Sequence, residues 1–372
     1  MSKSGEKLLM KGNEAIAEAA IRAGCGAYFG YPITPQNEII TYMAKYMLKR
    51  DRIFIQAESE IAAINMVYGA SSAGARAMTS SSSPGISLKQ EGISYAAGAD
   101  IPLVLVNIVR GGPGLGNLGP AQGDYFQATR GGGHGDYHLI VLAPKNVQEC
   151  ADLTYLAFDL ADHYRIPVMV LGDGMIGQMI EGVVLPPERT LSELPQRDWT
   201  VGRRVGSGRE SRHITSLDLV PESLEAKIKA RFVRYDGIKA RETRFECIGF
   251  PLTTDEPVDG VRRGAPDLTL VAYGTAARVA LGAQKLAEKE GIRLGLFRPI
   301  TLWPFPHTPL EKIAETGKPI LTVEMSLGQL VEDVKLTVLG KAPVHLLGHS
   351  GGVIPTEEEV FAEAKRILEK KT

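Results

Sequence analysis

Hydrophobic residues stand in short runs through the first half of the chain, and longer stretches of helical character separate them. The runs predict strands at residues 52–56, 77–80, 103–109, 139–142 and 168–172, and the stretches between them predict helices at residues 39–48, 61–75, 86–98 and 148–162. Several of the runs are apolar throughout rather than alternating, so both faces of the sheet should be covered. This order predicts a parallel-sheet α/β domain over residues 1–185.

A polar, proline-containing stretch interrupts this pattern from residue 186 to residue 266. Within it, residues 203–244 carry eleven Lys and Arg against six Asp and Glu. We expect a linker that packs against a neighbouring subunit, and the alternative is a phosphate-binding surface for an anionic cofactor such as coenzyme A. Strand and helix patterns return afterwards, which predicts a second α/β domain over residues 267–372.

The composition narrows the classes of function. Lys and Arg (42) nearly balance Asp and Glu (43), and this formal net charge of −1 argues against a dedicated nucleic-acid-binding protein. No apolar run approaches the roughly 20 residues of a membrane-spanning helix. The first residues mix Lys with Glu before any apolar segment, unlike a secretory signal. We therefore expect a cytoplasmic protein that binds neither nucleic acid nor a membrane.

The three cysteines do not form a local metal site. Cys25, Cys150 and Cys247 lie about a hundred residues apart, and no pair has the close spacing of zinc or iron–sulfur ligands. We expect unreactive thiols and no metal site on this chain. If the protein carries out redox chemistry, its metal should lie on another chain.

Two glycine-rich segments resemble cofactor motifs but each lacks a required part. Gly114-Leu-Gly116-Asn-Leu-Gly119 has dinucleotide-binding spacing, yet Pro120 and further glycines prevent the helix that would hold the pyrophosphate. A nucleotide-binding oxidoreductase that uses NAD(P) at this loop remains an alternative. Gly172-Asp173-Gly174 resembles the start of a thiamine-diphosphate metal motif, but the Asn expected 25–30 residues later is missing because Asn146 is the last Asn. A turn at the end of a strand is the better interpretation.

Two predicted strand ends carry residues suited to chemistry. Thr34 followed by Pro35 predicts a helix N-cap whose hydroxyl could meet a substrate carboxylate, or simply a well-formed helix start. Glu60 follows the strand at 52–56 and opens a helix of small residues, where Gly69 should let that helix approach a neighbour. Parallel sheets bind ligands at such strand ends, and the carboxyl group could share a proton with a ring nitrogen. The alternative for Glu60 is a solvated acid in a first helical turn.

Several segments, in this order and spacing, resemble the α subunit of 2-oxoacid:ferredoxin oxidoreductases. They are Tyr31-Pro32-Ile33-Thr34-Pro35, Gln56-Ala-Glu-Ser-Glu60, residues 80–85 (SSSSPG) and Arg110-Gly-Gly-Pro113. Residues 297–305 (FRPITLWPF), 323–325 (VEM) and 348–352 (GHSGG) resemble that family's second domain. The resemblance implies a pyrimidine-binding-type domain of thiamine-diphosphate enzymes followed by a transketolase-C-terminal-like α/β domain.

The resemblance also implies a cofactor that is shared between subunits. Thiamine diphosphate would bind between this chain and a β subunit that carries the Mg²⁺–diphosphate half of the site. Glu60 matches the activating glutamate that hydrogen-bonds the aminopyrimidine ring. Substrate contacts are implied for Thr34, Arg110 and Tyr31, and cofactor contacts for Pro32, Ile33, Ser83 and Gly85.

The other participants are implied by the same resemblance. A γ subunit and a ferredoxin-like δ subunit would complete the complex, and the iron–sulfur clusters would lie on the partner subunits. Coenzyme A would be the co-substrate and ferredoxin the electron acceptor.

One loop points to the substrate. Members that act on 2-oxoglutarate commonly carry a Ser/Thr-rich loop ending in Pro-Thr after Arg-Gly-Gly-Pro, whereas this chain has residues 114–120 (GLGNLGP). Losing those hydroxyl groups removes partners for a distal carboxylate, and the loop resembles that of enzymes for branched-chain 2-oxoacids such as 2-oxoisovalerate (3-methyl-2-oxobutanoate). We expect CoA-dependent oxidative decarboxylation of a branched-chain 2-oxoacid, with a 2-oxoglutarate enzyme as the alternative. A non-catalytic scaffold subunit is a further alternative of a different class.

Overall fold

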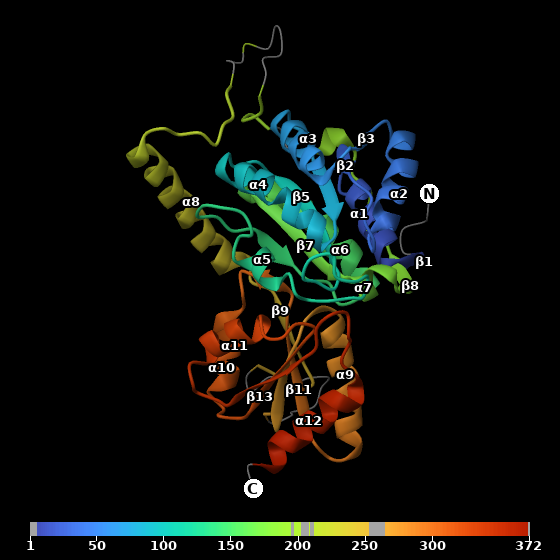
Figure 1. The fold of residues 1–372 in the computed structure, drawn as a ribbon, viewed down its shortest axis with the longest axis vertical. Coiled ribbons are helices and arrows are strands. Elements are labelled where there is room, and N and C mark those ends of the chain that lie inside the picture. The colour runs from blue at the N-terminus through green and yellow to red at the C-terminus, as the bar shows by residue number, and fades with distance from the viewer. Residues whose placement is uncertain (1–5, 195–196, 202–207, 209–211, 253–264, 371–372) are drawn as a thin grey trace.

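A computed structural model describes residues 6–370, except 195–196, 202–207, 209–211 and 253–264. Figure 1 shows an N-terminal α/β domain in blue and green above a C-terminal α/β domain in orange and red. The long helix α8 (Pro221–Glu242) lies along one side of the first domain. No helix in this described part of the chain combines the length and the apolar character needed to span a membrane.

The first domain is built on a seven-stranded sheet with the order β12-β6-β7-β5-β4-β2-β3. Its strands are β2 (Ala27–Gly30), β3 (Ile53–Gln56), β4 (Ala77–Ser81), β5 (Leu103–Val109), β6 (Ile140–Leu142), β7 (Pro167–Asp173) and β12 (Thr301–Trp303). Every pair of neighbours is parallel except β12 with β6. The central strands β4, β5 and β7 are buried along their whole length, which confirms a sheet that is covered on both faces.

Helices cover both faces of this sheet. They are α1 (Gly12–Arg22), α2 (Asn37–Tyr46), α3 (Glu60–Ser72), α4 (Ser83–Gly98), α5 (Tyr125–Thr129), α6 (Val147–Tyr164) and α7 (Gly174–Gln178). The elements predicted between residues 39 and 172 are present, with ends that agree within three residues. The sequence did not indicate the small antiparallel sheet of β1 (Lys7–Lys11) and β8 (Ile180–Val184) beside them.

The close packing of α3 on α4 depends on a glycine of α4. A Cβ atom at Gly92 would lie 2.7 Å from the side chain of Ile64, so no larger residue fits there without displacing α3. Gly69, which we expected to allow this approach, has no neighbouring atom within 4 Å of its Cβ position. That expectation was wrong because Gly69 lies on the exposed side of α3.

The second domain contains a five-stranded sheet with the order β14-β13-β10-β11-β9. Its strands are β9 (Phe245–Ile248), β10 (Leu268–Val271), β11 (Leu294–Pro299), β13 (Ile320–Glu324) and β14 (Val344–Gly348), and its helices are α9 (Gly274–Lys289), α10 (His307–Ala314), α11 (Leu330–Val338) and α12 (Glu357–Glu369). All pairs are parallel except β9 with β11. In Figure 1, α9 and α12 lie on one side of the sheet and α10 and α11 on the other.

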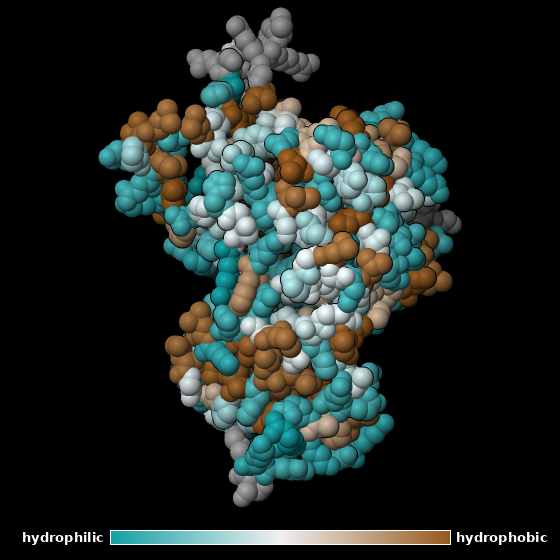
Figure 2. Space-filling view, in the orientation of Figure 1, coloured by the Kyte–Doolittle hydropathy of each residue, from teal (hydrophilic) through white to brown (hydrophobic). Residues whose placement is uncertain are grey.

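The polar stretch contains the helix α8, which the sequence did not suggest. Only Arg231, Tyr235 and Ile238 of this helix are buried. The Arg231 guanidinium donates to Asp100 Oδ1 (3.1 Å) and to the carbonyl oxygen of Gly98 (3.0 Å), which ties α8 to the first domain. Because one of its three buried positions is an arginine, α8 shows little apolar periodicity. Figure 2 shows brown, hydrophobic side chains at the upper end of this helix. Val233 of the helix is 73% exposed.

Two buried polar side chains join the domains. Asp173 Oδ1 caps α7 by accepting from the backbone N–H groups of Met175 and Ile176, both at 3.1 Å. The same carboxylate accepts from the N–H (3.1 Å) and the hydroxyl (2.7 Å) of Thr275 at the start of α9. Gln122 donates to the carbonyl oxygen of Tyr273 at 2.9 Å. The turn predicted at residues 172–174 is therefore a helix cap that also fixes the second domain against the first.

Candidate functional site

Four segments that the sequence singled out meet at one edge of the first sheet. Residues 31–36 follow β2, Glu60 follows β3, residues 82–85 follow β4, and Arg110 follows β5. These four strands are neighbours and run parallel, so their carboxyl ends lie at the same edge. Ligands of parallel sheets bind at such edges, and this edge is therefore the candidate site.

Arg110 links three of these segments. Its Nη1 donates to the carbonyl oxygen of Thr34 (2.9 Å), and its Nη2 donates to that of Leu115 (3.3 Å). Its backbone N–H donates to the hydroxyl of Ser83 at 3.1 Å. The residue is only 7% exposed, and its buried Nε has no hydrogen-bond partner among the described residues. Because buried donors are normally paired, this unpartnered N–H is unusual.

The turn after β2 differs from the predicted helix start. Gln36, not Thr34, is the N-cap of α2, which begins at Asn37. The Thr34–Pro35 peptide is cis, and the Pro35 carbonyl oxygen accepts from Asn13 at 2.8 Å. The hydrogen bond from Asn13 engages the Pro35 carbonyl, and α2 begins two residues later than Pro35. Thr34 therefore presents its carbonyl to the arginine, while its hydroxyl accepts from the Asn37 side chain at 3.2 Å.

A chain of buried polar groups that the sequence did not reveal supports this turn. The Tyr28 hydroxyl lies 2.6 Å from the Ser80 hydroxyl, which donates to Gln36 Oε1 at 2.6 Å. The amide of Gln36 in turn donates to the carbonyl oxygen of Tyr31 at 3.4 Å. Burial raises the pKa of Tyr28, so its hydroxyl stays protonated. A strand pattern tells neither that Tyr28 points inward nor which group it meets.

Glu60 occupies the first position of α3, directly after Ser59, whose hydroxyl caps the helix. Glu60 is 7% exposed, and its carboxylate lies against Gly85 of α4. A Cβ atom at residue 85 would come within 2.7 Å of Glu60 Oε1, so the glycine leaves the space that the carboxylate occupies. The hydroxyls of Ser81 and Ser82 are buried and have no hydrogen-bond partner among the described residues. The carboxylate of Glu60 and these two hydroxyl groups could therefore form polar contacts with a ring bound at this edge of the sheet.

A buried ammonium group lies on α4, the helix that also carries Gly85. Lys89 of α4 is fully buried, and its Nζ donates to the Thr79 hydroxyl at 3.1 Å. Burial lowers the pKa of Lys89 to about 8, although the negative charge of Glu60 acts in the opposite direction. The sequence predicted the helix but gave no sign that this lysine is enclosed.

The outer rim of the site is open to solvent on this chain. Tyr31 is 36% exposed, and Pro32 beside it is exposed as well. The loop after Arg110 exposes Leu115 (84%) and Leu118 (58%). Among the residues predicted to contact the cofactor, Glu60 and Gly85 are buried, Ser83 and Ile33 are half-buried, and Pro32 is exposed.

A cavity of 740 Å³ adjoins the site and lies between the domains. Its wall is formed by residues 83–84, 87, 111–114, 121 and 123–124 of the first domain and by residues 325–327, 329 and 350–351 of the second. Among the described lining residues, Asp124 is ionisable and none is Lys, Arg or His. Asn107 of β5 donates to Asp124 Oδ2 at 2.8 Å, and burial raises the pKa of Asp124. The sequence gave one sign of this pair, which is the single Asn in an otherwise apolar strand.

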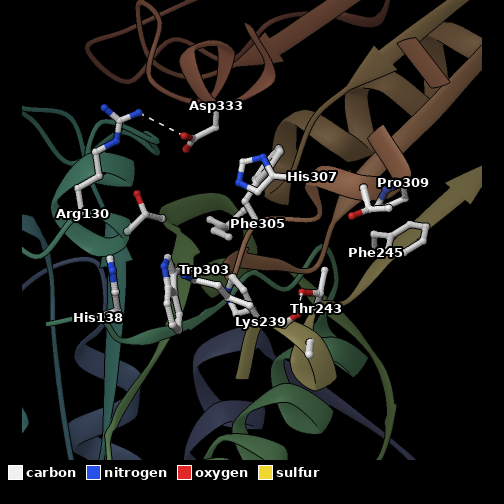
Figure 3. A pocket seen from close by; sticks show the side chains of 15 residues that line it. Arg130, His138, Lys239, Thr243, Phe245, Trp303, Phe305, His307, Pro309 and Asp333 are labelled. Carbon is white, nitrogen blue, oxygen red and sulfur yellow. Dashed lines mark hydrogen bonds and ion pairs between the residues drawn. The ribbon is translucent and has the colours of Figure 1, made fainter. Parts of the chain in front are cut away.

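A separate cavity of 660 Å³ lies between α5, α8, β12 and α10. Figure 3 shows Arg130 of its wall paired with Asp333, with Nη2 3.3 Å from Oδ1, and the rings of His138 and Trp303 face to face. Burial lowers the pKa of both His138 and His307, which keeps both imidazoles neutral at pH 7. The residues that the sequence predicted for the site do not line this cavity.

The remaining sequence features do not form a site. The Gly114 to Gly119 segment is a loop, and the next helix, α5, begins only at Tyr125 and has five residues. It therefore lacks the helix N-terminus that a dinucleotide pyrophosphate needs. Cys25 and Cys150 are buried and Cys247 is half-buried. Burial raises the pKa of Cys25 and of Cys247 to about 12, which agrees with the expected unreactive thiols.

Two protein families match the chain. Residues 18–235 match the family described as pyruvate flavodoxin/ferredoxin oxidoreductase, thiamine diphosphate-binding. Residues 266–360 match the core domain II of pyruvate:ferredoxin oxidoreductase. The first match contains all of the predicted site residues.

Curated relatives match over almost the whole length. The ketoisovalerate oxidoreductase subunit VorB of Methanothermobacter marburgensis is 45% identical over 360 residues, which are 96% of this chain and 97% of that one. The 2-oxoglutarate synthase subunit KorA of Methanothermobacter thermautotrophicus is 37% identical over 386 residues, 96% of this chain and 97% of that one.

Solved structures show a similar fold. The 2-oxoglutarate:ferredoxin oxidoreductase from Magnetococcus marinus, with 2-oxoglutarate, coenzyme A and succinyl-CoA bound, is 27% identical with a TM-score of 0.84. That match covers 98% of this chain but only 65% of the other, so this chain corresponds to part of the longer protein. A split-gene transketolase (inactive β4 tetramer) shares the fold alone, with 15% identity, a TM-score of 0.58 and coverage of 98% of this chain and 99% of that one.

Proposed function

The chain belongs to the thiamine diphosphate-binding family of pyruvate flavodoxin/ferredoxin oxidoreductases, and we propose from this that it helps to decarboxylate a branched-chain 2-oxoacid oxidatively. In the proposed reaction the bond between the carboxylate and the 2-oxo carbon breaks and releases carbon dioxide. The remaining acyl group forms a thioester with coenzyme A, whose thiol proton is released. Two electrons pass to ferredoxin, which completes the balance.

The observation that carries the proposal is the meeting of Glu60 and Arg110 at one sheet edge. Thiamine diphosphate supplies, when bound, the carbon nucleophile for the 2-oxo group. The carboxylate of Glu60 lies in the space over Gly85, where it can hold the proton of a pyrimidine ring nitrogen. The unpartnered hydroxyls of Ser81 and Ser82 fit a polar ring edge. We assign Pro32, Ile33, Ser83 and Gly85 to the wall around this ring.

Arg110 suits the carboxylate of the 2-oxoacid. Two of its three guanidinium nitrogens are occupied by the carbonyl oxygens of Thr34 and Leu115, and these bonds fix its orientation. The buried, unpartnered Nε then remains for a charge-assisted hydrogen bond to the substrate. We assign Thr34 and Tyr31, on the turn beside Arg110, to the same substrate contact.

The cavity beside the site supports a substrate with an apolar side chain. Its described lining offers no Lys, Arg or His to a second carboxylate, and Asp124 would repel one once ionised. The higher identity to the ketoisovalerate subunit (45%) than to the 2-oxoglutarate subunit (37%) points the same way. A 2-oxoglutarate enzyme is the second candidate, because its relatives also match over almost the whole length.

The rest of the enzyme should lie on partner subunits. The Gly172-Asp173-Gly174 turn is engaged in a helix cap, so we assign the Mg²⁺–diphosphate half of the cofactor site to a β subunit. We assign the iron–sulfur clusters to partner subunits, with a γ and a ferredoxin-like δ subunit completing the complex. The exposed apolar residues on α8 support a subunit contact there. We propose a cytoplasmic location, where ferredoxin and coenzyme A occur.

The test is dye reduction by the assembled complex. This chain is produced together with its candidate partner subunits, and reduction of a viologen dye is followed with thiamine diphosphate, Mg²⁺ and coenzyme A. The acids 2-oxoisovalerate, 2-oxoglutarate and pyruvate are compared, and we expect the highest kcat/KM with 2-oxoisovalerate. A preference for 2-oxoglutarate would overturn the substrate assignment alone. No reduction by a cofactor-loaded complex would favour the scaffold alternative, and NAD(P) binding by the isolated chain would favour the nucleotide-binding one.

A further inference from the structure

We infer that Asn117 is a positioning residue that lets the second domain hold the substrate-binding arginine in place. Asn117 lies in the loop of residues 111–119 and contacts the turn at Gly351 and Gly352 of the second domain. The inference rests on the proposed function, because it concerns how Arg110 is presented to a substrate carboxylate.

The side chain of Asn117 makes one bond within the loop and one across the domains. Its Oδ1 accepts from the backbone N–H of Gly119 at 2.8 Å. Its Nδ2 donates to the carbonyl oxygen of Gly351 at 2.5 Å. One amide group therefore sets the shape of the loop and fastens it to the second domain.

Glycines on both sides make room for this amide group. Cβ atoms at Gly111 and Gly352 would lie 2.6 and 2.8 Å from Asn117 Oδ1. A Cβ atom at Gly119 would lie 2.8 Å from the Cα of Gly352, so the two backbones also approach closely. Gly352 has a φ of +92°, a conformation that side chains with a Cβ rarely adopt. Of the glycines with dinucleotide-like spacing, Gly119 thus serves a close contact between domains.

The fastened loop reaches Arg110 through its backbone. Gly111 N–H donates to the Gly119 carbonyl at 2.9 Å, and Asn117 N–H donates to the Gly111 carbonyl at 3.0 Å, so the loop is closed on itself. Between these closing bonds, the carbonyl oxygen of Leu115 accepts from Arg110 Nη2. Movement of the loop would release this nitrogen and let the guanidinium turn. The bond from Asn117 to the second domain therefore opposes that rotation.

The alternative is that Asn117 only stabilises its own loop. In that case the contact with the second domain would be incidental, and a change on the side of Gly352 would not alter substrate binding. Two substitutions in the second domain separate these explanations without changing the loop sequence. An alanine at residue 352 points its Cβ at Asn117, whereas an alanine at residue 340, in the same domain, finds no atom within 4 Å. Both positions have a positive φ, +92° and +79°, so both variants carry backbone strain.

The experiment compares Asn117→Ala, Gly352→Ala and the control Gly340→Ala in the assembled complex. For each we measure KM and kcat with 2-oxoisovalerate, thiamine diphosphate affinity by fluorescence quenching, and hydrogen exchange of residues 111–119. For Asn117→Ala and Gly352→Ala we expect KM to rise about three- to tenfold, the range for one lost hydrogen bond. Their kcat and cofactor affinity should stay near wild type, and exchange in the loop should become faster. Gly340→Ala should match the wild type in all four quantities.

The outcomes distinguish this inference from the proposed function. If the wild-type complex oxidises no 2-oxoacid, the proposed function fails, but loop exchange still reports whether Asn117 fastens the loop. If the wild type is active and both test variants keep its KM, the inference is wrong and the function stands. A raised KM in Asn117→Ala alone, with Gly352→Ala folded and unchanged, would show that only the bond within the loop matters. Asn117 is exposed, so its variant should fold even if Gly352→Ala does not.

Discussion

Substituting Gly85 by alanine should damage catalysis while leaving the fold intact. The added Cβ would lie 2.7 Å from Glu60 Oε1 and 3.0 Å from Glu60 Cγ. An ordinary contact at this place needs at least about 3.4 Å, so the carboxylate has to move by roughly 0.5–1 Å. The Ser81 hydroxyl, 2.0 Å from the same Cβ position, has to rotate away as well. Both groups are ends of side chains, so the backbone of α4 can stay where it is.

The expected loss follows from this displacement. A misplacement of about 1 Å lowers the rate of a positioned reaction by about 10²-fold, so we expect kcat to fall by about 10- to 100-fold. The effect on stability should be small, because alanine favours a helix over glycine by about 0.5–1 kcal/mol and this gain offsets part of the crowding. The Tm should therefore stay within about 3 °C of the wild type.

The assay is viologen reduction at saturating 2-oxoisovalerate, together with the Tm of the same complex. Gly237→Ala in α8 is the matched control, because its Cβ would meet only Arg241 Nη2, at an ordinary 3.4 Å. This control should keep the wild-type kcat. If Gly85→Ala also kept the wild-type kcat, Glu60 could not be acting from the position seen here, and the reasoning would be refuted.

Four other substitutions test separate groups. Glu60→Gln should lower kcat by about 10²- to 10⁴-fold, the range for positioned proton transfer, and an unchanged rate in the viologen assay would remove Glu60 from this role. Arg110→Ala should raise the KM for the oxoacid by about 10- to 100-fold, because a charged hydrogen bond contributes about 1.5–3 kcal/mol; an unchanged KM would contradict the assignment. Lys89→Met should raise the Tm at pH 7, because burial lowers the pKa of Lys89 from 10.5 to about 8 and enclosing its charge costs on the order of 3 kcal/mol. Calorimetry should show this gain in Tm shrinking between pH 8 and 10.5, where the unfolded chain also loses the proton. A gain that stays constant with pH would contradict this cause. Burial alone would raise the pKa of Glu246, but hydrogen bonds from Arg298 and Lys145 outweigh burial and lower that pKa. Glu246→Gln should therefore reduce the Tm at pH 7, and the reduction should become smaller as the pH falls below about 4. Melting curves over a series of pH values would check this.

The sequence predicted the elements that position the site because each one carries its own signal. The strand at residues 103–109 is apolar except for Asn107, and residues at the ends of parallel strands must reach one edge of the sheet. Glu60 could therefore be expected at that edge from its place after the strand at residues 52–56, whereas Arg110 was assigned to the site by the family resemblance. The helix that follows Glu60 also began within one residue of its predicted start.

What the sequence could not predict depends on contacts between distant segments. Lys89 looks like any polar helix residue, and its enclosure follows only from packing against β4. The start of α2 was misplaced because Asn13, more than twenty residues earlier in the chain, holds the Pro35 carbonyl in a turn. The helix α8 was missed because Arg231 occupies one of its three buried positions. A local sequence pattern does not show which distant residue a side chain will contact, so these features could not be predicted from it.

The shared carboxylate of Asp173 has a consequence for motion at the site. Half of its four hydrogen bonds come from Thr275 of the second domain, and the carboxylate is fully buried. A hinge opening between the domains would break two of these bonds and leave a buried acceptor without a partner, which costs free energy. The two domains should therefore move as one rigid piece while substrate enters and product leaves. Because the loop after Arg110 is itself fastened to the second domain, gating has to come from a partner subunit.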